Sequence, residues 1–316
     1  ATALIVRVFS GALSDYLGKR KAVAVLGYGL GALSKPLFAL ATSMPAVLSA
    51  RFMDRVGKGI RAAPRDALIA DITPPGIRGA AYGLRQSLDT IGAVAGPLLA
   101  MVLMVVFAGE FRTVFWFAVI PAFLCVTLMI CGVHEPATAP GASKAAPKMH
   151  WGTMRELSPA YWWVVFIGSI FTLARFSEAF LILRARDLGL ADAYAPAVMI
   201  VMNIVYALTA YPAGQLADRM SRRTLLALGL GLLVGADLLL ASAASLAAVA
   251  AGVVFWGLHM GLTQGLLSTL VADTAPVHLR GTAFGFFNFA SGIAMLAASV
   301  LAGLLWDSLG AATTFY

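Results

Sequence analysis

Two sequence landmarks occur twice in this chain, and both pairs keep nearly the same separation. The segment GALSDYLGKRK at 11–21 returns as GQLADRMSRRT at 214–224. The segment LIADITPPGIRGAAYG at 68–83 returns as LVADTAPVHLRGTAFG at 270–285. Two landmarks that share one offset of about 200 residues indicate an internal duplication rather than a chance match. We therefore expect a chain built from two related halves.

The composition places these halves in a membrane. Hydrophobic residues make up 60% of the 316 residues and charged residues only 12%, whereas soluble domains carry about a quarter charged residues. The net charge of +8 does not predict nucleic-acid binding, because the basic residues stand in short clusters between apolar runs. Cys125 and Cys131 share one apolar run without a histidine cluster, so neither a metal site nor another cofactor is indicated.

Runs of about 20 apolar residues are long enough to cross a bilayer as helices. Residues 1–10 resemble the tail of an earlier span, and a further span begins near 311. We expect an all-α membrane protein with two pseudo-symmetric six-helix bundles, truncated at both ends: the first helix, most of the second and most of the twelfth are missing. The complete spans are expected near 22–42, 46–70, 79–107, 113–132, 160–183, 194–213, 224–243, 247–271 and 281–306.

The segment between the two sets of spans has the composition of a linker. It is rich in Pro, Ala and small polar residues. The predicted domains are therefore an N-terminal bundle at 1–132, a cytoplasmic linker at 133–159 and a C-terminal bundle at 160–316.

Basic residues in alternate loops predict the orientation of the chain. One set of loops holds eleven and the other three, so the linker and both repeated basic loops are expected in the cytoplasm of a bacterial inner-membrane protein. The larger set is Lys19, Arg20, Lys21, Arg78, Lys144, Lys148, Arg155, Arg219, Arg222, Arg223 and Arg280, and the smaller set is Arg112, Arg184 and Arg186.

The first landmark resembles the loop signature G-x-L-x-D-x-x-G-R/K-R/K-R/K of the major facilitator superfamily. In the second copy, Ser221 stands in place of the later Gly. The resemblance implies a two-bundle fold, solute transport and a role for both loops in latching the cytoplasmic gate. It is carried by Gly11, Leu13, Asp15, Gly18, Lys19, Arg20 and Lys21, and in the second copy by Gly214, Leu216, Asp218, Arg219, Arg222 and Arg223.

Two further segments resemble motifs of the same family. Arg51 stands at the start of a pattern similar to R-x-x-x-G-x-G-x-G of the fourth helix, with Arg55 where the first Gly is usual; the resemblance implies a part in proton coupling for Arg51. Gly92, Gly96 and Pro97 resemble the fifth-helix motif of antiporters. Small residues allow close helix contact and Pro bends a helix, so plain packing stays open beside an exporting antiporter.

The span at 46–70 carries a stripe of charges. Seven charged residues fall within less than half of the helix circumference. A lipid-facing charge near the bilayer centre costs about 3 kcal/mol, so this face must contact water or protein. Five bases against two acids suit an anionic solute. The other interpretation is a charge network that locks the helix near the cytoplasmic gate, and it is favoured for Arg61, Arg65 and Asp66, which lie nearest the cytoplasm. The stripe comprises Arg51, Asp54, Arg55, Lys58, Arg61, Arg65 and Asp66.

Three acids are candidates for proton coupling. Asp54 has Arg51 and Lys58 at helical spacing, and Asp89 has Arg85 four residues earlier, which should hold both acids ionised. Glu178 lies among apolar residues near Arg175 and is the preferred site. Asp237 has no partner on its own helix, so its carboxyl group needs a partner from another part of the molecule. A structural hydrogen bond and a role in transport both stay open.

Candidate residues of the substrate cavity lie on the charged span and on two later spans. For His259, a contact between helices is the alternative to a contact with substrate. The candidates are Arg55, Lys58, Arg175, His259 and Gln264.

These features predict a secondary transporter that moves a small organic solute by alternating access, as a proton-coupled exporter working by antiport. A proton-coupled importer of an organic anion is the alternative. A channel is less compatible with duplicated gate loops, and a membrane enzyme would need a convergent catalytic set. ATP-driven transport would need the motif GxxxxGK[ST], which is absent from the sequence. The expected partners are the solute, protons and lipid, and the expected state is a monomer.

Overall fold

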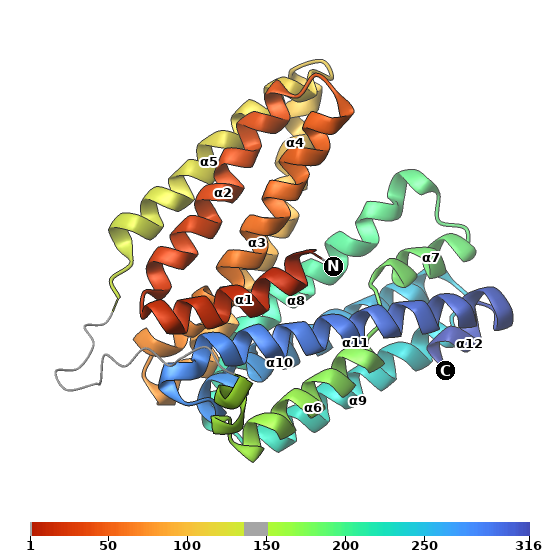
Figure 1. The fold of residues 1–316 in the computed structure, drawn as a ribbon. Coiled ribbons are helices and arrows are strands. Elements are labelled where there is room, and N and C mark those ends of the chain that lie inside the picture. Colours follow the sequence, from red (N-terminus) through yellow and green to blue (C-terminus); the bar gives the residue numbers. More distant parts are fainter. Residues whose placement is uncertain (1, 136–150) are drawn as a thin grey trace. The chain divides into compact units, whose positions relative to one another are not determined.

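The computed structural model describes residues 2–135 and 151–316, and in this part of the chain all regular elements are helical (Figure 1). Most of the predicted linker, including Lys144 and Lys148, lies outside the described residues. Short 3-10 turns precede several helices. The α-helices are α1 (Thr2–Leu17), α2 (Arg20–Leu40), α3 (Met44–Ile72), α4 (Arg78–Val106), α5 (Phe111–Gly132), α6 (Pro159–Ala174), α7 (Ala179–Asp187), α8 (Ala195–Arg219), α9 (Arg222–Ala241), α10 (Leu246–Thr274), α11 (Arg280–Leu309) and α12 (Ala311–Phe315).

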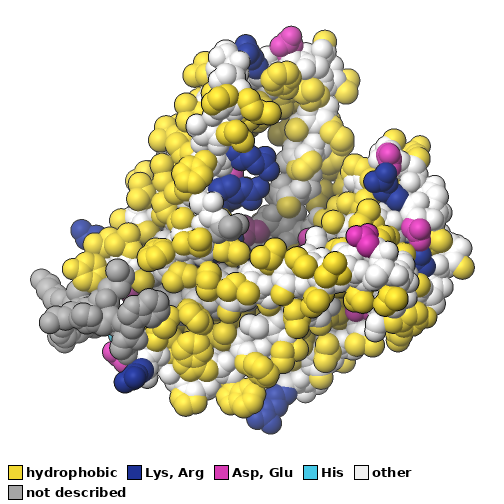
Figure 2. All heavy atoms as spheres, turned by 45° about the vertical axis from the view of Figure 1, so that its right-hand side comes forward, with side chains coloured by type: hydrophobic (Ala, Val, Ile, Leu, Met, Phe, Trp, Pro, Cys, Tyr) yellow, Lys and Arg dark blue, Asp and Glu magenta, His cyan; other side chains and the backbone are white. Residues whose placement is uncertain are grey.

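Among the described residues, eight helical segments are long and apolar enough to cross a membrane. The helix α3 has 29 residues, as many as α4 and α10, but its stripe of charges keeps it outside that set. Hydrophobic side chains cover most of the face seen in Figure 2. An apolar exterior of this kind fits a chain whose solvent is lipid.

The predicted spans coincide with helices, with one correction. The run predicted at 160–183 is two helices, α6 and α7, separated at 175–178. Phe176 leaves the helix at this break and packs against Trp256 and Phe180, with ring centroids 5.5 and 5.3 Å away. Burial of this aromatic cluster compensates for the interrupted helix, which hydropathy alone does not predict.

The first basic loop is a tight turn between α1 and α2. Gly18 has a φ of +60°, a conformation that L side chains rarely adopt. The second copy turns differently, because α8 ends in an extended Met220 with a φ of −109°. The Ser221 that replaces the later Gly therefore needs no left-handed conformation.

The helices form two compact units. Unit 1 consists of residues 1–74, 97–163 and 271–289, and unit 2 of residues 75–96, 164–270 and 290–316. In unit 1, α2 packs along α3 and α5, as Figure 1 shows. In unit 2, Trp256, Leu233 and Leu240 lie at the centre of an apolar core. The units differ from the halves of the repeat, because the start of α4 belongs to unit 2 and the start of α11 to unit 1.

Candidate functional site

Asp15, near the end of α1, caps the first turn of α11. Its carboxylate accepts hydrogen bonds from the amide nitrogens of Gly281 at 3.0 Å and Thr282 at 2.6 Å, and from the Thr282 hydroxyl at 2.8 Å. Asp15 is only 8% exposed. A helix start presents unpaired N–H groups and a partial positive charge, so a buried carboxylate is stabilised there.

The second copy of the landmark repeats this geometry within unit 2. Asp218, near the end of α8, accepts hydrogen bonds from the amide nitrogens of Gly79 and Ala80 in α4, both at 2.8 Å. The same acid of the duplicated loop therefore caps the corresponding helix, α4 in one copy and α11 in the other.

Glycines allow the backbones to approach at both contacts. A Cβ atom added at Gly11 would overlap the carbonyl oxygen of Gly281, and one added at Gly214 would overlap the carbonyl oxygen of Gly79. This explains why a glycine precedes the acid by four residues in both copies. The close approach places each carboxylate within hydrogen-bonding distance of the opposite helix start.

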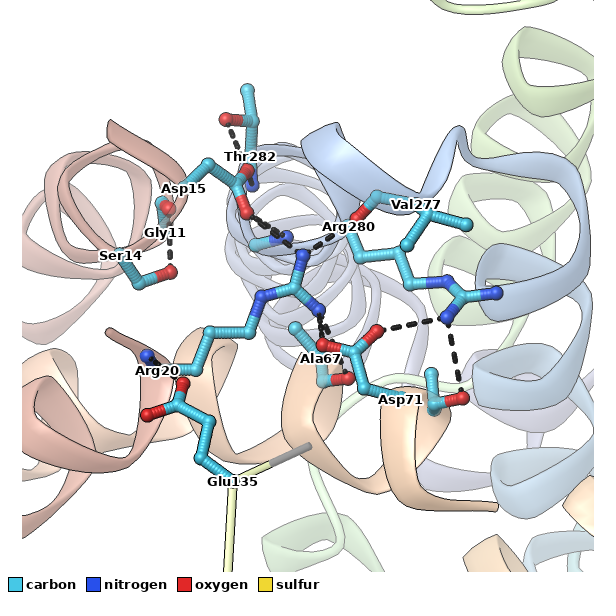
Figure 3. Close-up of polar contacts among 12 residues, drawn as sticks. Gly11, Ser14, Asp15, Arg20, Ala67, Asp71, Glu135, Val277, Arg280 and Thr282 are labelled. Carbon is cyan, nitrogen blue, oxygen red and sulfur yellow. Dashed lines mark hydrogen bonds and ion pairs between the residues drawn. The ribbon is translucent and has the colours of Figure 1, made fainter. Parts of the chain in front are cut away.

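A network of charges surrounds Asp15 in unit 1 (Figure 3). Arg20 pairs with Asp15 at 3.2 Å and with Asp71 of α3, and it donates to the carbonyl oxygen of Val277 at 2.6 Å. Arg280, the first residue of α11, pairs with the other oxygen of Asp71 at 2.8 Å. Asp71 thus bridges two buried arginines that come from opposite halves of the sequence.

The electrostatics of Asp15 reflect this environment. Burial is the largest influence and raises the pKa of the Asp15 carboxyl, while Arg20 and the donors of Thr282 and Gly281 oppose the rise. The ionised form that the cap requires therefore depends on its neighbours remaining in place.

The other basic residues of the repeated loops are more exposed to solvent than Arg20. Lys19 precedes the first residue of α2 and is exposed, as are Arg219 and Arg223, while Arg222 begins α9 and is partly buried. Of the predicted gate residues, the two acids, their glycines and Arg20 make the contacts described above.

The charged stripe on α3 is only partly as predicted. Asp54 pairs with Lys58 at 3.3 Å, as its spacing suggested, but its second partner is Lys35 of α2 at 3.0 Å. Arg51 was expected as that partner and instead lies exposed, as does Arg55. The reason is the packing of α2 against α3, which places a lysine from a different helix beside Asp54.

Two other predicted pairs have opposite outcomes in unit 2. Arg85 pairs with Asp89 at 3.0 Å, as expected. Arg175 and Glu178, which were expected to lie close together, form no ion pair in the described structure. The break after α6 removes the helical spacing between them. Arg175 is buried and donates to the sulfur of Met260, while Glu178 is partly buried at the start of α7.

His259 and Gln264 lie on α10. The Nδ1 atom of His259 lies 2.7 Å from the carbonyl oxygen of Gly229, and the side chain is 1% exposed. This geometry matches the contact between helices that stood as the alternative to a contact with substrate. Gln264 is partly buried.

Asp237 on α9 was expected to be satisfied from another helix. Its Oδ1 atom is buried and has no hydrogen-bond partner among the described residues. This oxygen therefore lacks the structural contact within the described structure, and the role in transport that stood beside it stays a prediction.

The glycines of the fifth-helix motif are not packed as expected. A Cβ atom added at Gly92 or at Gly96 would meet no atom within 4 Å, and both residues are exposed, as is Pro97. Close helix packing, which stood as the alternative for this motif, is therefore not seen at these two glycines in the described part of the chain. Close approach occurs instead at Gly79 and Gly83 of the same helix, where an added Cβ would overlap α8.

Sequence reasoning missed several residues of the site. It noted the repeat that contains Gly79 and Gly281 but assigned no role to these helix starts. It also did not foresee the pairing of Lys35 with Asp54, and it missed Asp71 and the pairing of Arg280. The signal for the helix starts was present, because RGAAYG and RGTAFG recur at the same offset as the acidic loops.

Comparisons with known proteins agree with this arrangement. The family model of the Major Facilitator Superfamily matches residues 1–299. The chain is 30% identical to an uncharacterized MFS-type transporter of Methanocaldococcus jannaschii over 96% of this chain and 76% of that protein. It is also 26% identical to the quinolone resistance protein NorA of Staphylococcus aureus, over 46% of this chain and 37% of that protein.

Among solved structures, the transporter FucP, in its outward conformation, is similar to this chain. The TM-score is 0.80 at 15% identity, over 99% of this chain and 83% of that one. These relatives and neighbours are transporters with the two-domain helical fold, which confirms the predicted all-α membrane fold and a transport role rather than an enzymatic one. The chain belongs to the Major Facilitator Superfamily.

Proposed function

We propose that this transporter moves a small organic solute by alternating access, with Asp15 and Asp218 as the two latches of its cytoplasmic gate. The observation that carries the proposal is that one geometry occurs twice. In each copy, an acid near the end of a helix from one half of the sequence caps a helix that begins in the other half. Opening such a gate requires both caps to be released, and closing it restores them.

The energetics of these contacts suit a latch. A carboxylate at a helix start contributes about 0.3 to 2 kcal/mol, and each hydrogen bond to a charged group about 1.5 to 3 kcal/mol. Two such latches would hold a closed state that solute binding can still overcome. The orientation in the proposal follows from the basic residues of both loops, which favour the cytoplasm of a bacterial inner membrane. A monomer suffices, because one chain carries both latches.

We further propose that transport is coupled to protons and runs as efflux by antiport. Glu178 supports proton coupling, because it is partly buried without an ion pair in the described structure. The resemblance of Gly92, Gly96 and Pro97 to the antiporter motif supports the direction. The partial similarity to a protein named for quinolone resistance points the same way.

A second candidate is uptake of an organic anion together with protons. One observation favours it: Lys35, Lys58 and Arg61 line a cavity in unit 1 with Asp54 as the acid among its lining residues. An excess of positive charge would attract an anion and repel a cation.

Reconstituted vesicles distinguish these candidates. The protein is inserted into liposomes, and counterflow is measured for organic anions, organic cations and neutral sugars. An imposed pH gradient then gives the direction, because antiport moves solute against the proton flow and symport moves it along with the flow. Counterflow that persists undiminished in the Asp15→Asn, Asp218→Asn double variant would remove the gate assignment.

A further inference from the structure

A small cavity with charged walls lies among α2, α3 and α5, inside unit 1. Its volume is about 130 Å³. Figure 2 shows Lys and Arg side chains gathered in a hollow of the visible face, with hydrophobic side chains around it. The polar groups in the cavity wall are Tyr28, Lys35, Asp54, Lys58, Arg61 and Cys125.

Asp54 shows how this wall binds a carboxylate. Lys35 Nζ lies 3.0 Å from its Oδ1 atom, and Lys58 Nζ lies 3.3 Å from its Oδ2 atom. Each oxygen thus has its own ammonium group, one from α2 and one from α3. The two lysine side chains are 30% and 44% exposed, so their charged ends remain accessible beside the pair.

Arg61 supplies a third cation without a carboxylate of its own. Its guanidinium lies 4.4 Å from the centre of the Tyr28 ring, a cation–π contact that positions the group. No hydrogen bond or ion pair joins Arg61 to another residue within the described structure. Three bases and one acid leave the wall with an excess of two positive charges.

We propose that this cavity binds the carboxylate of a small organic monocarboxylate, which displaces Asp54 from Lys35 and Lys58 and gains Arg61 as a third partner. The proposal rests on the second candidate function above, uptake of an organic anion together with protons, and names the solute class. The volume sets the size of the solute, because a cavity of about 150 Å³ accommodates one benzene molecule. Acetate and other short monocarboxylates fit this limit, whereas benzoate, which is larger than benzene, exceeds it.

Displacement of Asp54 links solute binding to a proton. Lys35 approaches the acid from α2, Lys58 and Arg61 line the wall from α3, and Tyr28 and Cys125 complete the titratable lining. Once the solute occupies the two ammonium groups, an ionised Asp54 would be an unpaired charge at membrane depth, which is costly. Asp54 therefore takes up a proton when the solute binds, and binding tightens as the pH falls.

The two cysteines of α5 provide a reporter and its control. Cys125 lines the cavity, while Cys131 lies six residues further along the helix and is not part of the lining. The Cys131→Ser variant leaves Cys125 as the only thiol, and the Cys125→Ser variant leaves Cys131. Maleimide labelling rates are measured in nanodiscs with a series of monocarboxylates from acetate to benzoate, with benzylammonium and with inorganic phosphate.

The expected result is that at least one monocarboxylate slows labelling of Cys125 about tenfold, equivalent to about 1.4 kcal/mol. Labelling of Cys131 should not change, and neither benzylammonium nor phosphate should protect Cys125. Absence of protection by every carboxylate would overturn the proposal, and so would equal protection by phosphate, by benzylammonium or at Cys131.

Two variants test the exchange with Asp54. In Asp54→Asn, half-protection should need about tenfold less carboxylate at neutral pH and should no longer depend on pH. Lys35→Gln should raise the required concentration about tenfold, which keeps the test decisive if Asp54→Asn does not fold. Native affinity that is independent of pH, together with an unaffected Lys35→Gln, would contradict the exchange. Labelling requires no transport, so intact transport without protection refutes this site alone, and protection without transport refutes the proposed function.

Discussion

The Oδ1 atom of Asp15 lies 3.0 Å from the amide nitrogen of Gly281, a residue 266 positions later in the chain. The duplicated acid makes the equivalent contact at the start of α4, at 2.8 Å. The two contacts occupy equivalent positions in the internal repeat, and each joins one half of the sequence to the other. This symmetry makes the two acids the natural place to test the gate.

Neutralising either latch should slow transport. Asp15→Asn and Asp218→Asn each keep one acceptor oxygen but remove the charge that the helix start favours. We expect turnover to fall about tenfold in each variant, which corresponds to about 1.4 kcal/mol, while membrane insertion stays normal. Counterflow in liposomes measures the change. The matched control is Asp192→Asn, at an exposed acid outside the gate; a loss of the same size there would remove the assignment.

Adding a methyl group should distinguish contact glycines from exposed ones. Gly214→Ala would push a Cβ atom into the carbonyl oxygen of Gly79, whereas Gly92→Ala and Gly96→Ala meet open space. We therefore expect Gly214→Ala to impair transport strongly and the other two to leave it near the native rate. Initial rates at equal protein density are the measurement. Severe loss in Gly92→Ala would show that the fifth-helix motif makes close contacts in another state of the cycle.

Asp71→Asn should destabilise the protein. The change would leave Arg20 and Arg280, each with a side chain 8% exposed, without the carboxylate that lies between them. Breaking a buried ion pair by removing one partner costs about 3 to 5 kcal/mol. Thermal unfolding in detergent should show a clearly lower midpoint. Glu156→Gln, at an exposed acid, serves as the control, and equal midpoints for the two variants would refute this reading of the network.

Glu178→Gln should abolish accumulation driven by a pH gradient. The substitution keeps the size of the side chain and removes its ability to carry a proton. Solute exchange, which needs no net proton movement, should persist. A pH-sensitive dye inside the vesicles reports the proton flux. Native proton flux in the variant would place the carrier elsewhere, with Asp54 and Asp89 next to be tested.

The sequence was sufficient for the spans, the repeat and the selection of Asp15 and Asp218, which the structure places at two helix starts. Apolar runs predict helices well because a bilayer admits few other structures. Spacing along one helix also predicted the pair of Arg85 and Asp89. Each of these inferences uses either the spacing of residues close in sequence or a comparison of the two repeats, and a single sequence supplies both.

Contacts between helices were beyond that information. Lys35 reaches Asp54 from another helix, and Asp71 joins two arginines that are far apart in sequence, so no local spacing reveals either pair. The break after α6 likewise depends on the packing of Phe176 against Trp256. The exposed Gly92 and Gly96 show the converse, because a motif typical of close packing need not be packed.

Distances between spin labels at Leu17 and Val277 test the gate most directly. Both side chains are exposed, at 48% and 64%, and they come from opposite halves of the sequence, at the end of α1 and just before α11. Electron spin resonance in nanodiscs, with Cys125 and Cys131 replaced by Ser, gives the distance distribution. The gate account predicts a short and a long population, with Asp15→Asn shifting the balance toward the long one. A single distribution that is identical in the native and Asp15→Asn proteins would contradict it.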